Sequence, residues 1–472
     1  MQDERLAAWI TALALAIGLI LRVQGMLSEY WFDELWSTSI ALSASGIADL
    51  YARAHDNNHL LNTLVIHWIG PRDGWLAYRS LAFGAGLLLL AAAVFERGRT
   101  PGERAVRALL LGSSPLVVLL STEARGYAPA LAAALGAWAV LRRRLESGGL
   151  APLLAFNALL PLGLLSHLVF VHVYLASLAY AVAVLRARAD GARPVLRELA
   201  LLFGLPGVLA ALHGVFFVAR METGGGPEFG ALEFVTRVVA FTYGVPEWSW
   251  LCAGLAAVGV GVFGSHLARG MRAGDPRWLF DLVIVVVSPL LLVLLFDPGV
   301  IAVRYFALQI VFFLLAFADR LAAWLAQPGT PRLAALGLLA TLLVGNATHQ
   351  LAFARTGRGQ YVAALRAMAA AEPGSGEIRV AADHDSRARL LVGYYARFVD
   401  RPIRFVRRGE TSELEPGWFI DHEVHPRDPP PTQITVLGRS YQLVGRHDFA
   451  YLSGFRWNLY RFVSEVSDES NE

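Results

Sequence analysis

The sequence predicts a polytopic α-helical membrane protein that carries a small α/β domain at its C-terminal end. Of its 472 residues, 56% are hydrophobic and only 17% are charged, and the mean hydropathy is +0.48. Ordinary globular chains are about 25% charged, so this deficit indicates burial in a membrane. The apolar runs are continuous and rich in Leu, Ala and Val, which favours spanning helices over a β-barrel.

About eleven segments are predicted to span the membrane, at roughly 20 residues each. The first resembles the core of a signal peptide, but it continues to Leu27 without a small-residue cleavage site, so we interpret it as an uncleaved span. The predicted spans are 7–27, 76–95, 106–121, 126–141, 151–166, 168–185, 198–219, 249–268, 278–296, 302–325 and 333–350. Residues 1–350 are therefore predicted to form a membrane domain.

Arginine is concentrated in every second loop between these spans. The rich loops contain Arg97, Arg99, Arg104 and Arg107, then Arg142, Arg143 and Arg144, then Arg186, Arg188, Arg193 and Arg197, then Arg269, Arg272 and Arg277. Positive loops face the cytoplasm, so we expect a cytoplasmic N-terminus and an outward-facing tail after residue 350. The formal charge of +3 is too small to indicate nucleic-acid binding.

The tail, residues 351–472, is polar and mixed in composition. Residues 360–371 and 386–398 read as helices, and 378–382 and 432–437 read as strands. We expect a small α/β domain on the outer face of the membrane.

The stretch EYWFDELWS, residues 29–37, follows the first span and places Asp33 and Glu34 side by side. The loop continues to about residue 75, and leucines at helical spacing in HDNNHLLNTLVIHW, residues 55–68, predict a helix lying on the membrane surface. Trp31, Trp36 and Trp68 suit the headgroup level. The loop is therefore expected to hold Asp33 near lipid headgroups.

Two later segments bring ionisable residues to the same predicted face. The turn STEARGYAP contains Glu123 and Arg125, and the loop DPGVIAVRYF contains Arg304 at the start of a span. Ionisable residues at such depth are costly and usually face a polar cavity or a partner.

Glycosyl transfer from a polyprenyl-phosphate sugar is the chemistry that needs these parts. A carboxylate takes the proton of the acceptor hydroxyl as that hydroxyl attacks the anomeric carbon. Arginines stabilise the charge that develops on the leaving phosphate. Direct displacement of this kind inverts the anomeric centre.

Simpler interpretations apply to each feature alone. The acidic pair can be solvated, Glu123 can pair with Arg125, and the histidine pairs His59 with His67 and His167 with His172 are weak metal-site candidates. In the tail, Asp385 or Ser386 is expected to cap a helix, and the glycines 224–226 read as a linker.

WFDELWS resembles the first-loop Asp-Glu motif of the GT-C membrane glycosyltransferases, which include protein O-mannosyltransferases and bacterial lipid A aminoarabinose transferases of the glycosyltransferase family 39 type. DNNHLLNTLVIHW with AYRSLAFGAG resembles their His-Pro-Pro-Leu helix and second-span start. STEARGYAP resembles their Glu/Gln-Ala-Arg-x-Tyr turn, and VRYF their late Arg-Tyr element. The likeness covers most of residues 1–350 in order, although Leu60-Leu61 replaces the Pro-Pro and the second-span Pro is absent.

The resemblance implies the GT-C fold, a bacterial inner-membrane location and an inverting glycosyltransferase. It assigns catalysis to Asp33 with Glu34, and substrate binding to the motif residues His59, Glu123, Arg125, Tyr127, Arg304 and Tyr305. The donor is a polyprenyl-phosphate sugar, the acceptor a protein, lipid or polysaccharide, and the surroundings membrane lipids. A divalent cation, Mg²⁺ or Mn²⁺, held by Asp33, Glu34 and Glu123 is a further expectation.

Two other functions are compatible with the sequence. A transporter or flippase of lipid-linked glycans would need mid-membrane ionisable groups and repeated halves. A non-catalytic membrane scaffold would depend on the tail and not on Asp33.

Overall fold

A computed structural model describes residues 2–53, 55–188, 191–222, 230–296, 302–372, 374, 376–424, 429–436, 438–450 and 452–465. The chain divides into two compact units. The membrane unit comprises Met1–Met26 and Ile40–Gln350, and the C-terminal unit comprises Leu27–Ser39 and Leu351–Glu472. The membrane unit thus ends at Gln350, and the segment 27–39, which contains Asp33, belongs to the C-terminal unit.

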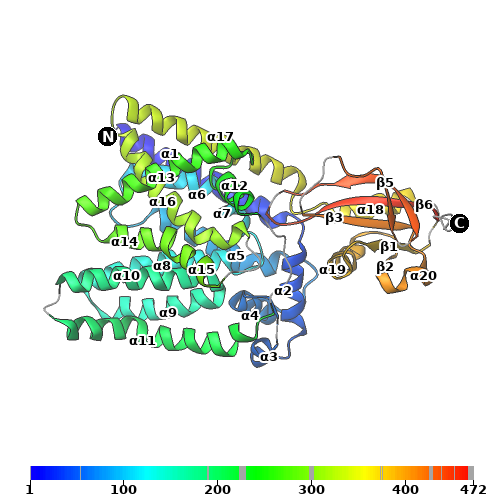
Figure 1. Cartoon of the computed structure of the whole chain (residues 1–472), viewed down its shortest axis with the longest axis horizontal. Coiled ribbons are helices and arrows are strands. Elements are labelled where there is room, and N and C mark those ends of the chain that lie inside the picture. Colours follow the sequence, from blue (N-terminus) through cyan, green and yellow to red (C-terminus); the bar gives the residue numbers. More distant parts are fainter. Residues whose placement is uncertain are drawn as a thin grey trace. The chain divides into compact units, whose positions relative to one another are not determined.

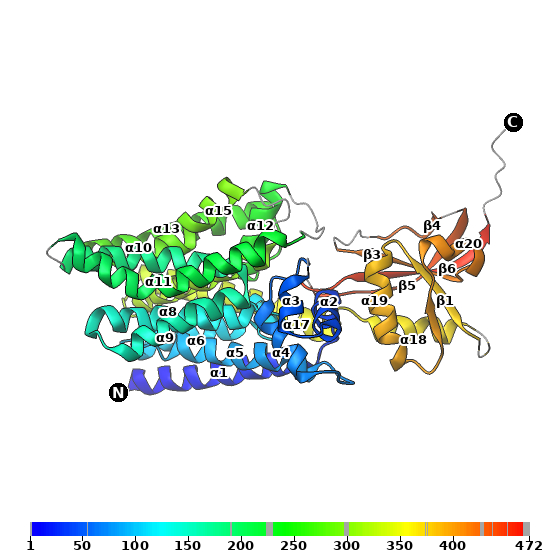
Figure 2. The ribbon, with the colours of Figure 1, turned by 90° about the horizontal axis from the view of Figure 1, so that it is seen from below.

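The membrane unit is a bundle of long helices that lie side by side (Figures 1 and 2). Its elements are α1 (Gln2–Leu27), α3 (Ile47–Ala52), α4 (Leu60–Ile69), α5 (Leu76–Val94), α6 (Pro101–Ser113), α7 (Pro115–Leu120), α8 (Tyr127–Ser147), α9 (Leu150–Ser166), η1 (Leu168–Phe170), α10 (Val171–Arg188), α11 (Ala192–Phe216), η2 (Val218–Arg220), α12 (Ala231–Tyr243), α13 (Ser249–Arg272), α14 (Arg277–Leu282), the π-helical η3 (Val283–Val287), α15 (Ser288–Phe296), η4 (Val303–Phe306), α16 (Ala307–Leu325) and α17 (Thr330–Thr356). The helices α2 (Phe32–Ser43) and α17 cross the boundary between the units, since the membrane unit starts again at Ile40 and ends at Gln350.

All eleven predicted spans are helical. Among the described residues, eight helices are long and apolar enough to cross a membrane. The remaining predicted spans are α8, the 17-residue α9, and the segment 106–121, which is two helices rather than one continuous span. Pro115 cannot donate a backbone hydrogen bond, and the Ser114 hydroxyl accepts one from Val117 N, so a new helix begins there.

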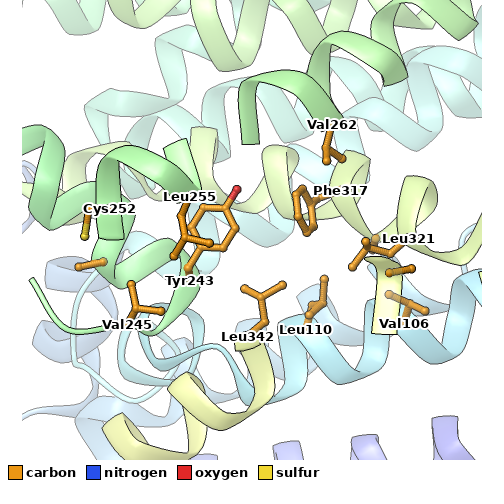
Figure 3. Packing of buried hydrophobic residues seen from close by; sticks show 13 residues of the cluster. Val106, Leu110, Tyr243, Val245, Cys252, Leu255, Val262, Phe317, Leu321 and Leu342 are labelled. Atoms are coloured by element: carbon orange, nitrogen blue, oxygen red, sulfur yellow. The ribbon is translucent and has the colours of Figure 1, made fainter. Parts of the chain in front are cut away.

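A buried apolar cluster ties five helices of the membrane unit together (Figure 3). It includes Val106 and Leu110 of α6, Leu255 of α13, Phe317 of α16 and Leu342 of α17, with α12 contributing as well. The sole cysteine, Cys252, lies in this cluster at 2% exposure. The helices therefore bury a shared core, which fixes the positions of their ends.

The predicted Arg-rich loops gather at one end of this bundle. Arg107 is bound by both Asp319 and Glu96 at 2.7 Å, and Glu96 also accepts from Arg142 at 2.5 Å. Arg142 lies near the end of α8, whereas Tyr127 begins that helix, so about 23 Å of helix separates the two. Tyr127 and the turn before it therefore lie at the opposite end of α8 from the arginine network.

The C-terminal unit contains a six-stranded sheet of order β2-β1-β3-β6-β5-β4. The strands are β1 (Ile378–Ala382), β2 (Ile403–Phe405), β3 (Trp418–Glu423), β4 (Gln433–Val436), β5 (Arg439–His447) and β6 (Arg456–Glu465), and the helical elements are α18 (Tyr361–Ala371), α19 (Asp385–Tyr395), η5 (Ala396–Phe398), η6 (Arg408–Glu410) and α20 (Thr411–Leu414). β1 is parallel to β2 and β3, and the other neighbours are antiparallel. The predicted small α/β domain is confirmed.

Two expectations for smaller features are wrong. Asp385 is the first residue of α19 rather than its N-cap; the N-cap is His384, which makes no side-chain cap, and Asp385 instead accepts a hydrogen bond from Arg408 N. Trp31 is 4% exposed and packs near Phe455, so it is a packing residue of the C-terminal unit rather than a headgroup anchor. The predicted glycine linker at 224–226 lies outside the described residues.

Candidate functional site

The acidic pair begins α2, within the C-terminal unit. Trp31 O accepts the backbone N–H groups of Glu34 and Leu35, and Asp33 and Glu34 occupy the first turn, where the helix dipole favours carboxylates. Glu34 reaches back so that its Oε2 accepts from Trp31 N at 3.4 Å. The local sequence therefore builds a helix start in which both carboxylates have defined places.

The two carboxylates have different environments. Glu34 is fully buried, and its Oε2 lies 4.0 Å from Nε of Arg358, whose side chain is also fully buried. Asp33 is only partly buried. Of the predicted catalytic pair, Asp33 is therefore the more accessible, whereas Glu34 faces the protein interior.

The remaining predicted residues lie in the membrane unit, around His59. The turn 121–126 is held by Asn62 of α4, whose amide donates to Ala124 O at 2.6 Å, and Arg125 N donates to Glu123 O at 2.7 Å. Arg125 Nε then donates to His59 Nε2 at 2.8 Å. Two segments far apart in the sequence thus meet through one side-chain hydrogen bond.

Both ring nitrogens of His59 have close partners. Arg125 Nε donates to Nε2, Gly126 N donates to Nδ1 at 3.2 Å, and Ser166 O lies 3.3 Å from the same Nδ1. A Cβ at Gly126 would overlap Ser166 O. A residue larger than glycine at this position would displace the imidazole from Ser166.

Aromatic rings surround the His59 imidazole. The Tyr127 and His167 rings lie 4.9 and 4.7 Å from it and 4.3 Å from each other, and Tyr305 lies 6.2 Å from His167. His59, Tyr127 and His167 are at most 1% exposed, while Arg125 and Arg304 are partly exposed. We call His59, Arg125, Tyr127, His167, Arg304 and Tyr305 the Arg125 cluster.

Both histidines of the cluster are neutral. Burial lowers the pKa of His59 well below its usual value, and the charges of Arg125 and Arg304 lower it further. Burial, Arg125 and Arg304 likewise lower the pKa of His167. The cluster therefore carries its positive charge on the two guanidinium groups.

His167 is the cluster member that the sequence prediction did not include. Its Nδ1 accepts from Val169 N at 3.1 Å, which places the proton of the neutral ring on Nε2. Among the described residues, that buried Nε2–H has no hydrogen-bond partner. The predicted pairing of His167 with His172 is not formed, since His172 Nδ1 contacts Ser288 Oγ at 3.0 Å. Only the coincidence of a histidine with a turn between two spans could have pointed to it.

Glu123 and the other metal-site candidates do not form a metal centre in the part of the chain described. No group of three or more His, Cys, Asp or Glu side chains is arranged there to hold a metal ion. Glu34 and Glu123 are both fully buried, and Glu34 faces Arg358. His67 contacts Ala41 O rather than His59. A divalent cation stays a prediction, and the mechanism below derives no step through it.

The eight apolar helices and the small sheet domain define a multi-pass membrane protein with a C-terminal domain. No known family model matches the sequence, and no curated protein matches it. Solved structures match almost the whole chain, and two ArnT structures are among them. ArnT from Cupriavidus metallidurans in the apo state matches at TM-score 0.55 and 12% identity, over 98% of each chain. ArnT from the same organism bound to undecaprenyl phosphate matches at TM-score 0.52 and 13% identity, over 98% of this chain and 99% of that chain.

The chain therefore shares the fold of ArnT over nearly its full length, and the fold predicted from the sequence, a polytopic helical membrane protein with a small C-terminal domain, is confirmed.

Proposed function

We propose that the protein is an inverting glycosyltransferase that moves a sugar from a polyprenyl-phosphate donor to an acceptor hydroxyl on the outer face of a bacterial inner membrane. The observation that carries this proposal is the Arg125 cluster, in which two guanidinium groups stand among neutral imidazole and phenol rings. Such a cluster suits a phosphate. The GT-C fold, and the undecaprenyl phosphate bound to one of the similar ArnT structures, support the same ligand class.

Residues of the membrane unit bind the donor. Arg125 and Arg304 pair with the donor phosphate, and the buried Nε2–H of His167 donates a further hydrogen bond to it. Tyr127 and Tyr305 line this position. His59 binds Arg125 as a neutral imidazole and so fixes the position of the guanidinium.

A residue of the C-terminal unit takes the proton of the acceptor. The acceptor oxygen attacks the anomeric carbon while Asp33 takes the hydroxyl proton, and the bond from that carbon to the phosphate oxygen breaks. The electron pair leaves with the polyprenyl phosphate, whose added charge the arginines stabilise. Glu34 positions Asp33 rather than raising its basicity by like-charge repulsion, because Arg358 offsets the charge of Glu34.

The test is transfer by the purified protein in proteoliposomes, with a panel of polyprenyl-phosphate sugars labelled in the sugar. Wild type is expected to transfer at least one sugar, and Asp33→Asn is expected to reduce kcat by about 100- to 10,000-fold, the usual range for loss of a general base. Asp49→Asn is the matched control, because Asp49 pairs with Arg53 on an exposed helix turn. Transfer by Asp33→Asn at the wild-type rate would remove the assigned base.

The two other functions predict different outcomes in the same liposomes. Movement of lipid-linked sugar across the bilayer without a covalent product would indicate a flippase. A scaffold would show neither transfer nor flux, and its phenotype in cells would survive Asp33→Asn.

The proposed orientation has its own test, because the single Cys252 is buried. In a Cys252→Ser background, Ser386→Cys on the C-terminal unit should react with an impermeant maleimide in spheroplasts. Ser147→Cys, exposed beside the arginine-rich end of α8, should react only after permeabilisation. The reverse pattern would invert the topology.

A further inference from the structure

The segment that carries Asp33 is fastened to the C-terminal unit at several consecutive residues. The carboxylate of Glu29 accepts from Tyr361 N at 2.6 Å and from Val362 N at 3.3 Å, so it caps the start of α18. The Tyr395 hydroxyl accepts from Tyr30 N at 2.5 Å and donates to Tyr30 O at 2.6 Å. These contacts fix the backbone just before α2.

Arg358 extends this attachment to the acidic pair itself. Its guanidinium donates to the Ser28 hydroxyl and lies beside Glu34. Its cationic carbon is 5.3 Å from the Phe353 ring, and its own carbonyl accepts from the Tyr361 hydroxyl at 3.0 Å. Gly454 packs so closely on the Arg358 carbonyl that a Cβ there would overlap it. Arg358 is thus held from several sides with little freedom to move.

The charge balance explains why this arginine matters. Glu34 is fully buried, and a buried carboxylate without a compensating charge is strongly unfavourable. Without Arg358, Glu34 would turn toward solvent or take up a proton, and its bond to Trp31 N at the start of α2 would be lost or weakened. Asp33 immediately precedes Glu34 in that helical turn, so its carboxylate would shift too.

We propose that Arg358 is a positioning residue for the catalytic base, acting through Glu34, and that the C-terminal unit is thereby a working part of the transferase. This inference rests on the proposed function of Asp33. It assigns the tail a role in orienting the base rather than only in receiving the acceptor. Tyr395, through its two hydrogen bonds to Tyr30, has the same role with a smaller effect.

The experiment separates kcat from donor binding in the full-length protein. Arg358→Gln should lower kcat by about 10- to 100-fold, the loss typical of a misplacement near 1 Å. Its affinity for undecaprenyl phosphate should stay within about threefold of wild type, because the assigned phosphate ligands lie in the membrane unit. Arg358→Lys should recover part of the rate. The double variant Arg358→Gln/Glu34→Gln should exceed the single variant, because no buried charge remains unpaired.

Two further variants guard against an effect of misfolding. Arg456→Gln removes another buried arginine of the same unit, one that pairs with Asp448 and Glu423, and it should leave kcat within about twofold. Tyr395→Phe keeps the ring and should lower kcat by about three- to tenfold. If folded Arg358→Gln and Tyr395→Phe both transfer at the wild-type kcat, the inference is wrong. It is also wrong if Arg456→Gln loses as much rate as Arg358→Gln. If the wild-type protein showed no transfer that depends on Asp33, the proposed function itself would be wrong, and this inference would lose its basis.

Discussion

The acidic start of α2 and the Arg125 cluster differ in the groups that contact their charged side chains. In the C-terminal unit, the charge of Glu34 is compensated by the opposite charge of Arg358. In the membrane unit, Arg125 is hydrogen-bonded by the neutral imidazole of His59, which does not reduce its charge. One site therefore holds a buried carboxylate against an arginine, and the other holds an arginine against a neutral ring.

This difference predicts that the two units affect different kinetic quantities. Substitutions in the Arg125 cluster should weaken binding of the donor phosphate, whereas substitutions around Asp33 should lower kcat at unchanged affinity.

The largest expected effect on lipid affinity comes from Arg125→Ala. It removes one of two cations from the cluster and leaves His59 Nε2 without its donor, so the affinity for undecaprenyl phosphate should fall by about 100-fold. Titration of the detergent-solubilised protein with the lipid measures this affinity. Asp33→Asn is the matched comparison and should bind the lipid as wild type does. If both variants lost the same affinity for the lipid, the proposal that the two units affect different kinetic quantities would be wrong.

Gly126→Ala tests the support of His59 rather than its ligand. The new Cβ would overlap Ser166 O, so the turn and the imidazole must move apart, and overpacking of this kind costs about 1–3 kcal/mol. We expect a lower thermal midpoint together with weaker lipid binding. Gly84→Ala in α5, where a Cβ would meet nothing within 4 Å, is the control. Wild-type stability in Gly126→Ala would show that Ser166 does not fix the ring.

Much of the fold could be predicted from the sequence because local signals carry it. Continuous apolar runs mark the helices, and the predicted strand at 378–382 coincides with β1. The break between α6 and α7 has a local signal as well, the Ser114-Pro115 pair, which a window on hydropathy alone passes over. The strands β5 and β6 pair over long stretches, but both contain arginines and residues 456–460 of β6 are all buried, so the alternation expected of a half-buried strand is hidden.

The candidate site, like the fold, could be predicted only in part from the sequence. Asp33, His59, Arg125 and Arg304 were predicted because they fall within recognisable motifs in order. Arg358 and His167 have no such motif, and their roles depend on contacts with residues far away in the sequence. The membership of the segment 27–39 in the C-terminal unit is equally non-local, because it rests on Tyr395, Tyr361 and Arg358. No periodicity in EYWFDELWS reveals those partners.

Glu29 provides a smaller test, through pH. Burial raises its pKa to about 7, although the backbone N–H groups of Tyr361 and Val362 and the charge of Arg366 act in the opposite direction. The folded state then holds a proton that the unfolded chain releases near pH 4.5, so this contribution to stability is full below that pH and is lost as the pH rises through 7. Glu29→Gln should flatten the fall of the thermal midpoint between pH 5 and 8, by on the order of 1–2 kcal/mol. The histidines of the Arg125 cluster, with lowered pKa values, contribute the opposite slope and lose stability as the pH falls. An unchanged pH slope in Glu29→Gln would contradict the assignment.

The smallest effect is expected at His167, which tests whether a neutral ring of the Arg125 cluster binds the phosphate. If the buried Nε2–H donates to the donor phosphate, His167→Phe should weaken binding of undecaprenyl phosphate by about tenfold, since one hydrogen bond contributes roughly 1–1.5 kcal/mol. His167→Gln keeps an N–H donor and should stay within about threefold. Undecaprenol, which lacks the phosphate, is the control ligand, and its binding should change little in either variant. Equal binding of the phosphate lipid by His167→Phe and wild type would mean that the ring only packs against Tyr127, and Arg125 and Arg304 would then be the only assigned donors to the phosphate.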